Sequence, residues 1–501
     1  MPEDSRPETL LDLLARRDDH PALIDPASGA VLTYAGLHAQ IRAVAARLAG
    51  AGVRAGDRVA ISLANGPALV VAVLAITALG AAVAPINPAL SEAEIRAEID
   101  DLGVSMMLYG APASEPASAA AVAAGVPAQA VSSNADGSVE IDGAEDAAAV
   151  ELASDPESLA LLLHTSGTTS RPKTVPLRQR NLAFSARTIV ESYGLSPDDV
   201  SYCVMPLFHI HGLVAATLAA LAAGGTVVVP PKFSATTFWD DVHTYGVTWY
   251  TAVPTIHLVV ANTCADGRQT GHHLRFVRSC SSTLPPPLWR RFEAAVGVPL
   301  VEAYGMTEAA HQMTSNPLPP GDRRAGSVGV ATGIEVGVLD EQWQPVPAGE
   351  SGEVCVRGRS IVDGYLDNPE ANAAGFRDGW FRTGDVGTLS PDGYLTLVGR
   401  IKELINRGGE KISPYEVEAV LLEHPAISEA AAYPQPDEKY GEQVAAVVVA
   451  TADVTEADLI KHCADRMVAF KVPVTIAIRR EIPKGPTGKI QRRALASLVD
   501  T

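Results

Sequence analysis

Short runs of apolar residues alternate with helical patterns along the chain up to about residue 400. Arg58–Leu63, Thr226–Val229 and Thr248–Ala252 are runs of this kind, and each has the length of a buried strand. Apolar strands separated by helices are typical of parallel sheets that are covered on both faces. The pattern therefore predicts an α/β architecture with largely parallel sheets.

The longest apolar segment is Ala68–Ala84, which is rich in alanine and interrupted by Gly80. It is 17 residues long, whereas a membrane-spanning helix needs about 20. Pro67 directly before it suits the first turn of a helix. We therefore expect a buried helix here rather than a membrane span.

Towards the C-terminus the charged residues become denser and the pattern changes. Tyr415–Leu422 has the pattern of an amphipathic helix, and Gln443–Ala450 that of a strand. We place a domain boundary near Lys402, which gives a large domain over residues 1–400 and a smaller one over 401–501.

The composition, 47% apolar and 19% charged, is that of an ordinary folded protein. Ala111–Ala149, rich in Ala, Ser and Gly, predicts a loosely specified surface region. The net charge of −19 argues against nucleic acid as a partner, because phosphate binding needs clustered Lys and Arg. The five cysteines have no paired short spacing, which suits a reducing compartment. We expect a soluble, cytoplasmic protein with no membrane partner.

The segment Leu159–Lys173 carries the first candidate chemistry, because an apolar strand leads into a loop rich in hydroxyl groups. The loop contains Gly167 and ends at Lys173, and its hydroxyl residues are Thr165, Ser166, Thr168, Thr169 and Ser170. Hydroxyl and backbone N–H groups can surround polyphosphate oxygens, glycine allows close approach, and lysine supplies charge. The glycine spacing fits neither the G-x-x-x-x-G-K-[ST] loop nor the kinase glycine loop. A Ser/Thr-rich surface turn is the alternative for this segment taken alone.

Further motifs follow in a fixed order along the chain. The six motifs are TSGTTSRPK (165–173), MPLFHIHG (205–212), EAYGMTE (302–308), RTGD (382–385), GRIKELINRGGEKISPYEVE (399–418) and PKGPTGKIQR (483–492). Together they resemble the acyl-adenylate-forming superfamily of acyl-CoA synthetases, luciferases and adenylation domains. The resemblance implies a large N-terminal domain of stacked α/β sheets and a small, mobile α+β C-terminal domain. It also implies that an acid and ATP form acyl-AMP and pyrophosphate, after which the thiol of CoA takes the acyl group.

The resemblance assigns the phosphate and metal contacts to two of these motifs. Thr307 is implied as a hydroxyl donor to the α-phosphate, and Glu308 as the Mg²⁺ ligand. Mg²⁺ typically takes only one or two protein carboxylates beside phosphate oxygens. The implied phosphate-loop contacts are Thr165, Ser166, Gly167, Thr168, Thr169 and Lys173.

The remaining nucleotide contacts follow from the same resemblance. Tyr304 and Gly305 are implied at the adenine site, and Ser282 is a further ATP contact. Asp385 is implied to accept hydrogen bonds from the ribose hydroxyls, assisted by Arg400. A bare Thr-Gly-Asp sequence would by itself indicate a simple turn.

The small domain is implied to serve both half-reactions in turn. Lys489 resembles the lysine that bridges the attacking carboxylate and the α-phosphate, where charge develops. Rotation about a hinge at Lys402 would then replace it with the loop containing Arg407, Gly408 and Gly409. Paired glycines allow close approach to the pantetheine arm of CoA, although a tight hairpin turn would also use them.

The region of the acyl pocket contains His209, Ser281 and His311, whereas a fatty-acid enzyme should be apolar there. Isolated histidines are more often structural than ligand contacts. Five segments, however, resemble oxalate–CoA ligases: KFSATTFW (232–239), TWYTAVPTIH (248–257), LRFVRSCSS (274–282), TEAAHQMTSNPLP (307–319) and GRIKELINRGGEKISP (399–414). This resemblance places the three residues around the distal carboxylate of oxalate. A buried second carboxylate needs such partners, because an unpaired buried charge is costly. We expect the histidines to act best at lower pH, where imidazolium is more populated.

The sequence leaves the acceptor open. A carrier protein or an amine could take the acyl group in place of CoA, although no carrier domain is visible in the sequence.

The residue after Pro172-Lys173 is Thr174, where the family has glycine, so the loop exit could follow another backbone path. A nucleotide-binding protein with weakened catalysis is therefore a further alternative.

Overall fold

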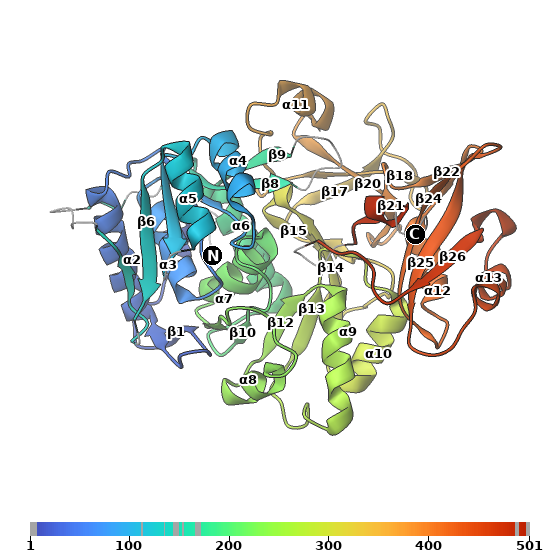
Figure 1. Ribbon diagram of the computed structural model, residues 1–501, viewed down its shortest axis with the longest axis horizontal. Helices are drawn as coiled ribbons and strands as arrows, with labels where there is room; N and C mark the ends of the chain where they lie inside the picture. Colours follow the sequence, from blue (N-terminus) through green and yellow to red (C-terminus); the bar gives the residue numbers. More distant parts are fainter. Residues whose placement is uncertain are drawn as a thin grey trace.

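The computed structural model describes residues 8–111, 114–134, 136–143, 150–152, 155–165, 172–485 and 490–496. These residues form four sheets and the helices that pack against them (Figure 1). The last sheet lies at the right of Figure 1, in orange, beside the larger part of the molecule.

A seven-stranded sheet with the order β7-β6-β5-β3-β4-β8-β9 lies in the N-terminal part. Its five central strands are parallel, and β7 and β9 are antiparallel to their neighbours. The strands are β3 (Arg58–Ser62), β4 (Ala82–Pro85), β5 (Met106–Gly110), β6 (Ala128–Ser133), β7 (Val139–Ile141), β8 (Leu159–Thr165) and β9 (Lys173–Arg178). The helices of this part are α2 (Tyr34–Gly50), α3 (Pro67–Ala78), α4 (Glu92–Leu102) and α5 (Glu115–Ala124).

A nine-stranded sheet with the order β16-β15-β14-β13-β12-β10-β11-β1-β2 follows. The run from β14 to β1 is parallel. The strands are β1 (Pro21–Ile24), β2 (Val31–Thr33), β10 (Val200–Tyr202), β11 (Thr226–Val228), β12 (Trp249–Ala252), β13 (Phe276–Ser279), β14 (Leu300–Met306), β15 (His311–Ser315) and β16 (Val330–Ala331). The accompanying helices are α1 (Leu10–Leu13), α6 (Gln179–Tyr193), the π-helix η2 (His211–Leu218), α7 (Ala219–Ala222), α8 (Phe238–Thr244), α9 (Pro254–Asn262), η3 (Thr263–Asp266), α10 (Pro286–Val296) and η4 (Thr307–Ala309).

Two five-stranded sheets complete the fold. The first contains β17 (Glu335–Leu339), β18 (Ser351–Arg357), β19 (Phe376–Arg377), β20 (Trp380–Leu389) and β21 (Leu395–Arg400), with α11 (Pro369–Gly375). The second contains β22 (Ile405–Arg407), β23 (Glu410–Ile412), β24 (Ile427–Asp437), β25 (Gly441–Ala450) and β26 (Thr475–Arg479), with α12 (Pro414–Leu421), α13 (Glu456–Ala464), η5 (Ala469–Lys471) and α14 (Arg492–Leu495). The predicted α/β class, with a large N-terminal and a smaller C-terminal domain, is confirmed. The boundary near Lys402 stays a prediction, and it falls between the third and fourth sheets.

The apolar segment after Pro67 is only partly helical. Helix α3 ends at Ala78, and all but one of its 12 residues are buried. Gly80 then adopts φ +73°, a conformation that glycine takes without strain, and the chain continues as strand β4. The predicted helix over Ala68–Ala84 was therefore too long at its end. Within the described part of the chain, no helix has both the length and the apolar character that crossing a membrane requires.

The description of Ala111–Ala149 as loosely specified was wrong for its described residues, although most of them do lie at the surface. This segment contains helix α5 and strands β6 and β7. Small side chains mislead here because they pack closely: Ala117, Ala120 and Ala121 are all buried against the neighbouring helix and sheet.

Strand β14 carries a buried carboxyl group that the sequence did not single out. Glu302 is only 6% exposed, and the backbone N–H of Leu284 donates to its Oε1 at 2.9 Å. Burial raises the pKa of the Glu302 carboxyl from 4.5 to about 8. The folded protein therefore holds this proton at pH values at which the unfolded chain has lost it.

We expect Glu302 to make the free energy of unfolding fall as pH rises from about 4.5 to about 8, by up to about 1.4 kcal/mol per pH unit. Glu302→Gln keeps an acceptor for Leu284 but has no proton to lose, so this slope should largely disappear. Urea unfolding at pH 5.5 and pH 8 measures it, with the exposed Glu341→Gln as control. A slope unchanged in Glu302→Gln would show that Glu302 does not carry the effect.

Candidate active site

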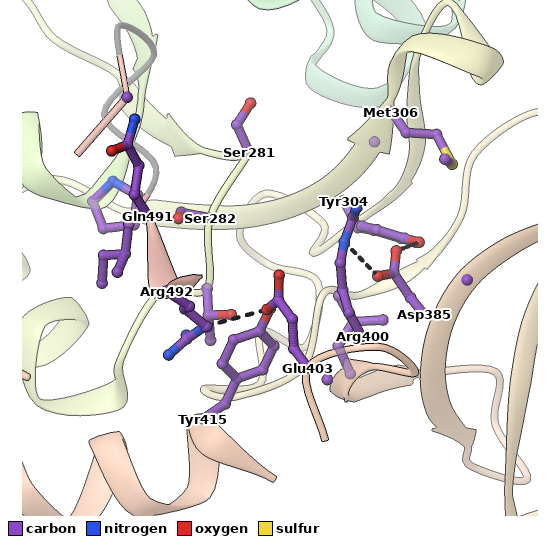
Figure 2. Close-up of a pocket in the computed structure, with 18 of the residues that line it drawn as sticks. Ser281, Ser282, Tyr304, Met306, Asp385, Arg400, Glu403, Tyr415, Gln491 and Arg492 are labelled. Carbon is purple, nitrogen blue, oxygen red and sulfur yellow. Dashed lines mark hydrogen bonds and ion pairs between the residues drawn. The ribbon is translucent and has the colours of Figure 1, made fainter. Parts of the chain in front are cut away.

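A cavity of about 2030 Å³ is lined by residues from both the N-terminal part and the C-terminal sheet. Thr307 and Asp385 line it from one side, and Tyr415 and Gly485 from the other. Figure 2 shows Tyr415 and Arg492 on one side of this space and Tyr304, Arg400 and Asp385 on the other. The motifs far apart in the sequence thus meet around one space.

Asp385 is held by two of the other residues assigned to the nucleotide (Figure 2). It lies in β20 and is 6% exposed. The Tyr304 hydroxyl donates to one of its carboxylate oxygens, and Arg400 Nε lies 3.1 Å from the other. The adjacent Asp385 raises the pKa of the Arg400 guanidinium, so this guanidinium stays charged. Ser282, Gly305 and Thr307 line the same cavity.

Glu308 follows β14 directly, in the short helix η4. It is 6% exposed, and the hydroxyl of Tyr365 donates to its Oε1 at 2.8 Å. The ammonium group of Lys173 lies 4.4 Å from the centre of the Tyr365 ring. Burial raises the pKa of the Glu308 carboxyl. Tyr365 lies outside every motif, so no signal in the sequence pointed to it.

The donor set around Glu308 suits Mg²⁺ better than a metal held entirely by protein. The described residues contain no cluster of three or more His, Cys, Asp or Glu that could hold a metal ion. Mg²⁺ needs only one or two carboxylates, because phosphate oxygens and water complete its shell. Glu308 lines the cavity next to Thr307 and could supply that carboxylate.

Of the predicted phosphate-loop contacts, the structure describes the two ends. Thr165 ends β8 and Lys173 begins β9, and these residues are paired across the two strands. Ser166, Gly167, Thr168 and Thr169 lie outside the described residues.

Thr174, the departure from the family pattern, lies within β9 and pairs with His164 of β8. Its φ is not positive, so the β-branched side chain fits the strand without strain. The effect of this threonine on the path of the loop exit stays a prediction.

His209, Ser281 and His311 all line the cavity, and we call this part its acid end because the sequence predicts that it receives the acid. The Ser281 hydroxyl lies 3.0 Å from Nδ1 of His211, and the rings of His211 and His311 lie 5.0 Å apart. Ser281 and His311 both have positive φ, at 70° and 109°. For residues other than glycine such angles are costly, and they occur most often at functional sites.

The structure adds two residues to this end that sequence reasoning missed. One is His211, which is buried beside Ser281 and whose backbone N–H donates to Nδ1 of His209 at 3.2 Å. Behind them, Arg278 donates to Nε2 of His311 at 3.2 Å. Both missed residues stand inside the segments that carried the resemblance, two positions after His209 and three before Ser281.

Lys489 lies outside the described residues, but Gly485 and Ile490 on either side of it line the cavity. Lys402 lines it as well. Arg407 ends β22, and Gly408 and Gly409, with φ of 61° and 99°, make the turn to β23. This turn is not among the described residues that line the cavity. Gly485 and Ile490 thus line the cavity, whereas the paired-glycine turn does not.

Comparison with known proteins agrees with this geometry. A family model described as "AMP-binding enzyme" matches residues 12–366, and "AMP-binding enzyme C-terminal domain" matches 416–489. An oxalate–CoA ligase of Arabidopsis thaliana is 46% identical over 478 residues, covering 93% of both chains. A sulfoacetate–CoA ligase of Cupriavidus necator is 38% identical and covers 97% of both. The crystal structure of ATP-bound MatB from Rhodopseudomonas palustris superposes with a TM-score of 0.89 at 31% identity, covering 98% of both.

The two family matches span both parts of the chain, and the first of them includes Tyr304 and Glu308. The chain belongs to the AMP-binding enzyme family and is an AMP-forming acid–CoA ligase, with ATP, Mg²⁺ and CoA as its cofactors.

Proposed function

We propose that the acid activated by this ligase is oxalate. The observation that carries the proposal is the polar end of the cavity, where Ser281 and His311 are backed by the buried guanidinium of Arg278. A hydrocarbon chain would offer no acceptor and no negative charge to this end of the cavity, whereas a second carboxylate would offer both. The relatives named for oxalate and sulfoacetate support this assignment, because both of those acids carry a second anionic group.

In the first half-reaction, a carboxylate oxygen of the acid attacks the α-phosphorus of ATP. The bond from that phosphorus to the bridging oxygen of pyrophosphate breaks, and acyl-AMP forms. The Thr307 hydroxyl and the Lys489 ammonium group stabilise the charge that develops on the phosphoryl oxygens. Asp385 and Arg400 hold the ribose. Mg²⁺ at Glu308 would neutralise charge on the phosphates when bound.

In the second half-reaction, the thiol of CoA releases its proton and its sulfur attacks the acyl carbon. The bond between that carbon and the AMP oxygen breaks, which gives the thioester and AMP. Rotation of the residue 401–501 domain about Lys402 would bring the Arg407–Gly408–Gly409 turn to the cavity for this step. The position of Gly485 and Ile490 at the cavity supports an arrangement suited to the first step.

Pyrophosphate release across a panel of acids tests the proposal. Oxalate should give the highest kcat/KM, above sulfoacetate, malonate, hexanoate and cinnamate, and CoA should be the acceptor that sustains turnover. Carrier protein and hydroxylamine, added in separate reactions, distinguish the other acceptors. Preference for hexanoate or cinnamate would contradict the choice of oxalate, and turnover only with carrier protein or amine would contradict the choice of CoA.

Glu308→Gln should lower the rate of pyrophosphate release by about 100-fold or more and raise the Mg²⁺ concentration needed for half-maximal rate, because it removes a metal ligand. The folded state should persist, since the amide can still accept from Tyr365. The rate is measured as a function of Mg²⁺, with the exposed Glu350→Gln as control. An unchanged rate and Mg²⁺ dependence would remove Glu308 from the site.

Lys489→Ala should lower acyl-AMP formation by about 100- to 1,000-fold, because a cation aimed at the α-phosphate is lost. Thioester formation from synthetic acyl-AMP and CoA should stay within a few-fold of wild type. Lys461→Ala, in the exposed part of α13, is the matched control in the same domain. An equal loss in both half-reactions would contradict alternation of the small domain.

A further inference from the structure

Arg278 places a fully buried positive charge behind the acid end of the cavity. It lies in β13 and is 0% exposed. Among the described residues its guanidinium donates to the Tyr193 hydroxyl at 2.9 Å, Thr251 Oγ1 at 3.0 Å, Gln312 Oε1 at 3.1 Å and His311 Nε2 at 3.2 Å, and the Cys280 thiol is a further side-chain partner. An arginine does not lose its proton in proteins, and buried charges are normally paired. The described structure gives this one no carboxylate partner, so its charge is balanced best by an anion in the adjoining cavity.

One branch of this network fixes the proton on His311. The guanidinium can only donate, so Nε2 of His311 must accept from it. A neutral His311 therefore carries its proton on Nδ1. His311 lines the cavity, and its Nδ1 is therefore a hydrogen-bond donor.

The second branch reaches Ser281 through Thr251 and His211. Thr251 Oγ1 accepts from Arg278 and keeps its own hydrogen, and Nε2 of His211, 2.6 Å away, is the acceptor that the described residues offer to that hydrogen. Burial, together with the nearby His311 and Arg278, lowers the pKa of His211 well below its ordinary value, so the ring is neutral. Its proton is then on Nδ1 and is donated to Ser281 Oγ at 3.0 Å. The hydroxyl hydrogen of Ser281 is left for a ligand in the cavity.

We infer that Arg278 is the positioning residue that sets the proton positions of His311, His211 and Ser281, and so selects acids with a second, anionic group. This inference rests on the proposed function, because it concerns how the same acid end recognises oxalate. The guanidinium acts in two ways: it makes His311 Nδ1 and Ser281 Oγ hydrogen-bond donors, and it supplies the positive charge that a second carboxylate requires. The histidines contribute as neutral donors.

Thr251→Val tests the relay without removing the charge, because valine keeps the shape of threonine and lacks the hydroxyl. We expect kcat/KM for oxalate to fall by about 10- to 100-fold, the effect of weakening a hydrogen bond to a charged group. The rate with propionate, which has no second carboxylate, should change by less than about 3-fold. Thr251→Ser restores the hydroxyl and should restore oxalate activity. Thr77→Val, which removes a buried hydroxyl from α3, is the matched control.

The proton positions are read directly by ¹⁵N NMR of histidine-labelled protein. In the wild type, His211 and His311 should both show a protonated Nδ1 and an unprotonated Nε2. His211 should lose this single form in Thr251→Val, because Nε2 no longer has its donor, while His311 should keep it. Arg278→Gln should abolish the preference for oxalate over propionate, and thermal melting reports whether that variant is folded.

The outcomes separate this inference from the proposed function. If the wild type does not activate oxalate, the proposed function fails. If the wild type does activate oxalate, two results would show that the relay through Thr251 is wrong. In one, Thr251→Val lowers the oxalate and propionate activities equally; in the other, it lowers neither. A wild-type His211 or His311 protonated on Nε2 would overturn the inference even if every variant failed to fold.

Discussion

A buried guanidinium needs an acceptor for its N–H groups, and this requirement ties together the elements at the acid end of the cavity. Arg278 of β13 lies directly opposite Thr251 of β12 in the strand register, and it bonds to Gln312 of β15 and Tyr193 of α6. A shift of any one of these elements would leave a charged donor unsatisfied in the interior, which is costly. The network therefore holds three strands and a helix in the arrangement that the acid site requires.

Strands β14 and β15 approach each other closely at Gly305 and His311. A side chain at Gly305 would place its Cβ 1.9 Å from the carbonyl oxygen of His311, so only glycine fits there. Gly305 thus lets His311 reach the cavity while Tyr304, its neighbour, bonds to Asp385 at the nucleotide end. The predicted acid and nucleotide ends of the cavity are thus linked through the paired strands β14 and β15. On the proposed function, a carboxylate held at one end is directed towards the phosphate held at the other, which is how positioning accelerates such a reaction.

The sequence predicted those parts of the fold and site that depend on local pattern. The strands β3, β11 and β12 and the helix α12 lie within about two residues of their predicted bounds, because buried strands and amphipathic helices have distinct periods. The end of α3 was missed because Ala-rich apolar sequence suits both helix and buried strand, and only Gly80 separates them.

Among the site residues too, the sequence predicted those that belong to local motifs and missed those that depend on distant contacts. The motifs supplied Tyr304, Asp385 and Arg400, which the structure brings together, although their roles stay predictions. Tyr365 and Arg278 depend on contacts between residues far apart in the chain, which no local pattern records. The expectation that His209 and His311 act best as imidazolium stays a prediction. His211, which the sequence did not single out, is neutral, because burial and the nearby His311 and Arg278 lower its pKa.

The central claim is that a fixed arginine charge and neutral histidines, rather than imidazolium, receive the second carboxylate. Calorimetric titration of oxalate into the enzyme with Mg²⁺ and a non-hydrolysable ATP analogue, repeated at pH 7.5 in buffers of different ionisation enthalpy, counts the protons taken up. The account predicts no net uptake, because Arg278 is charged before oxalate binds and His211 stays neutral. Uptake of about one proton per oxalate would show that a histidine becomes charged on binding, and it would contradict the account.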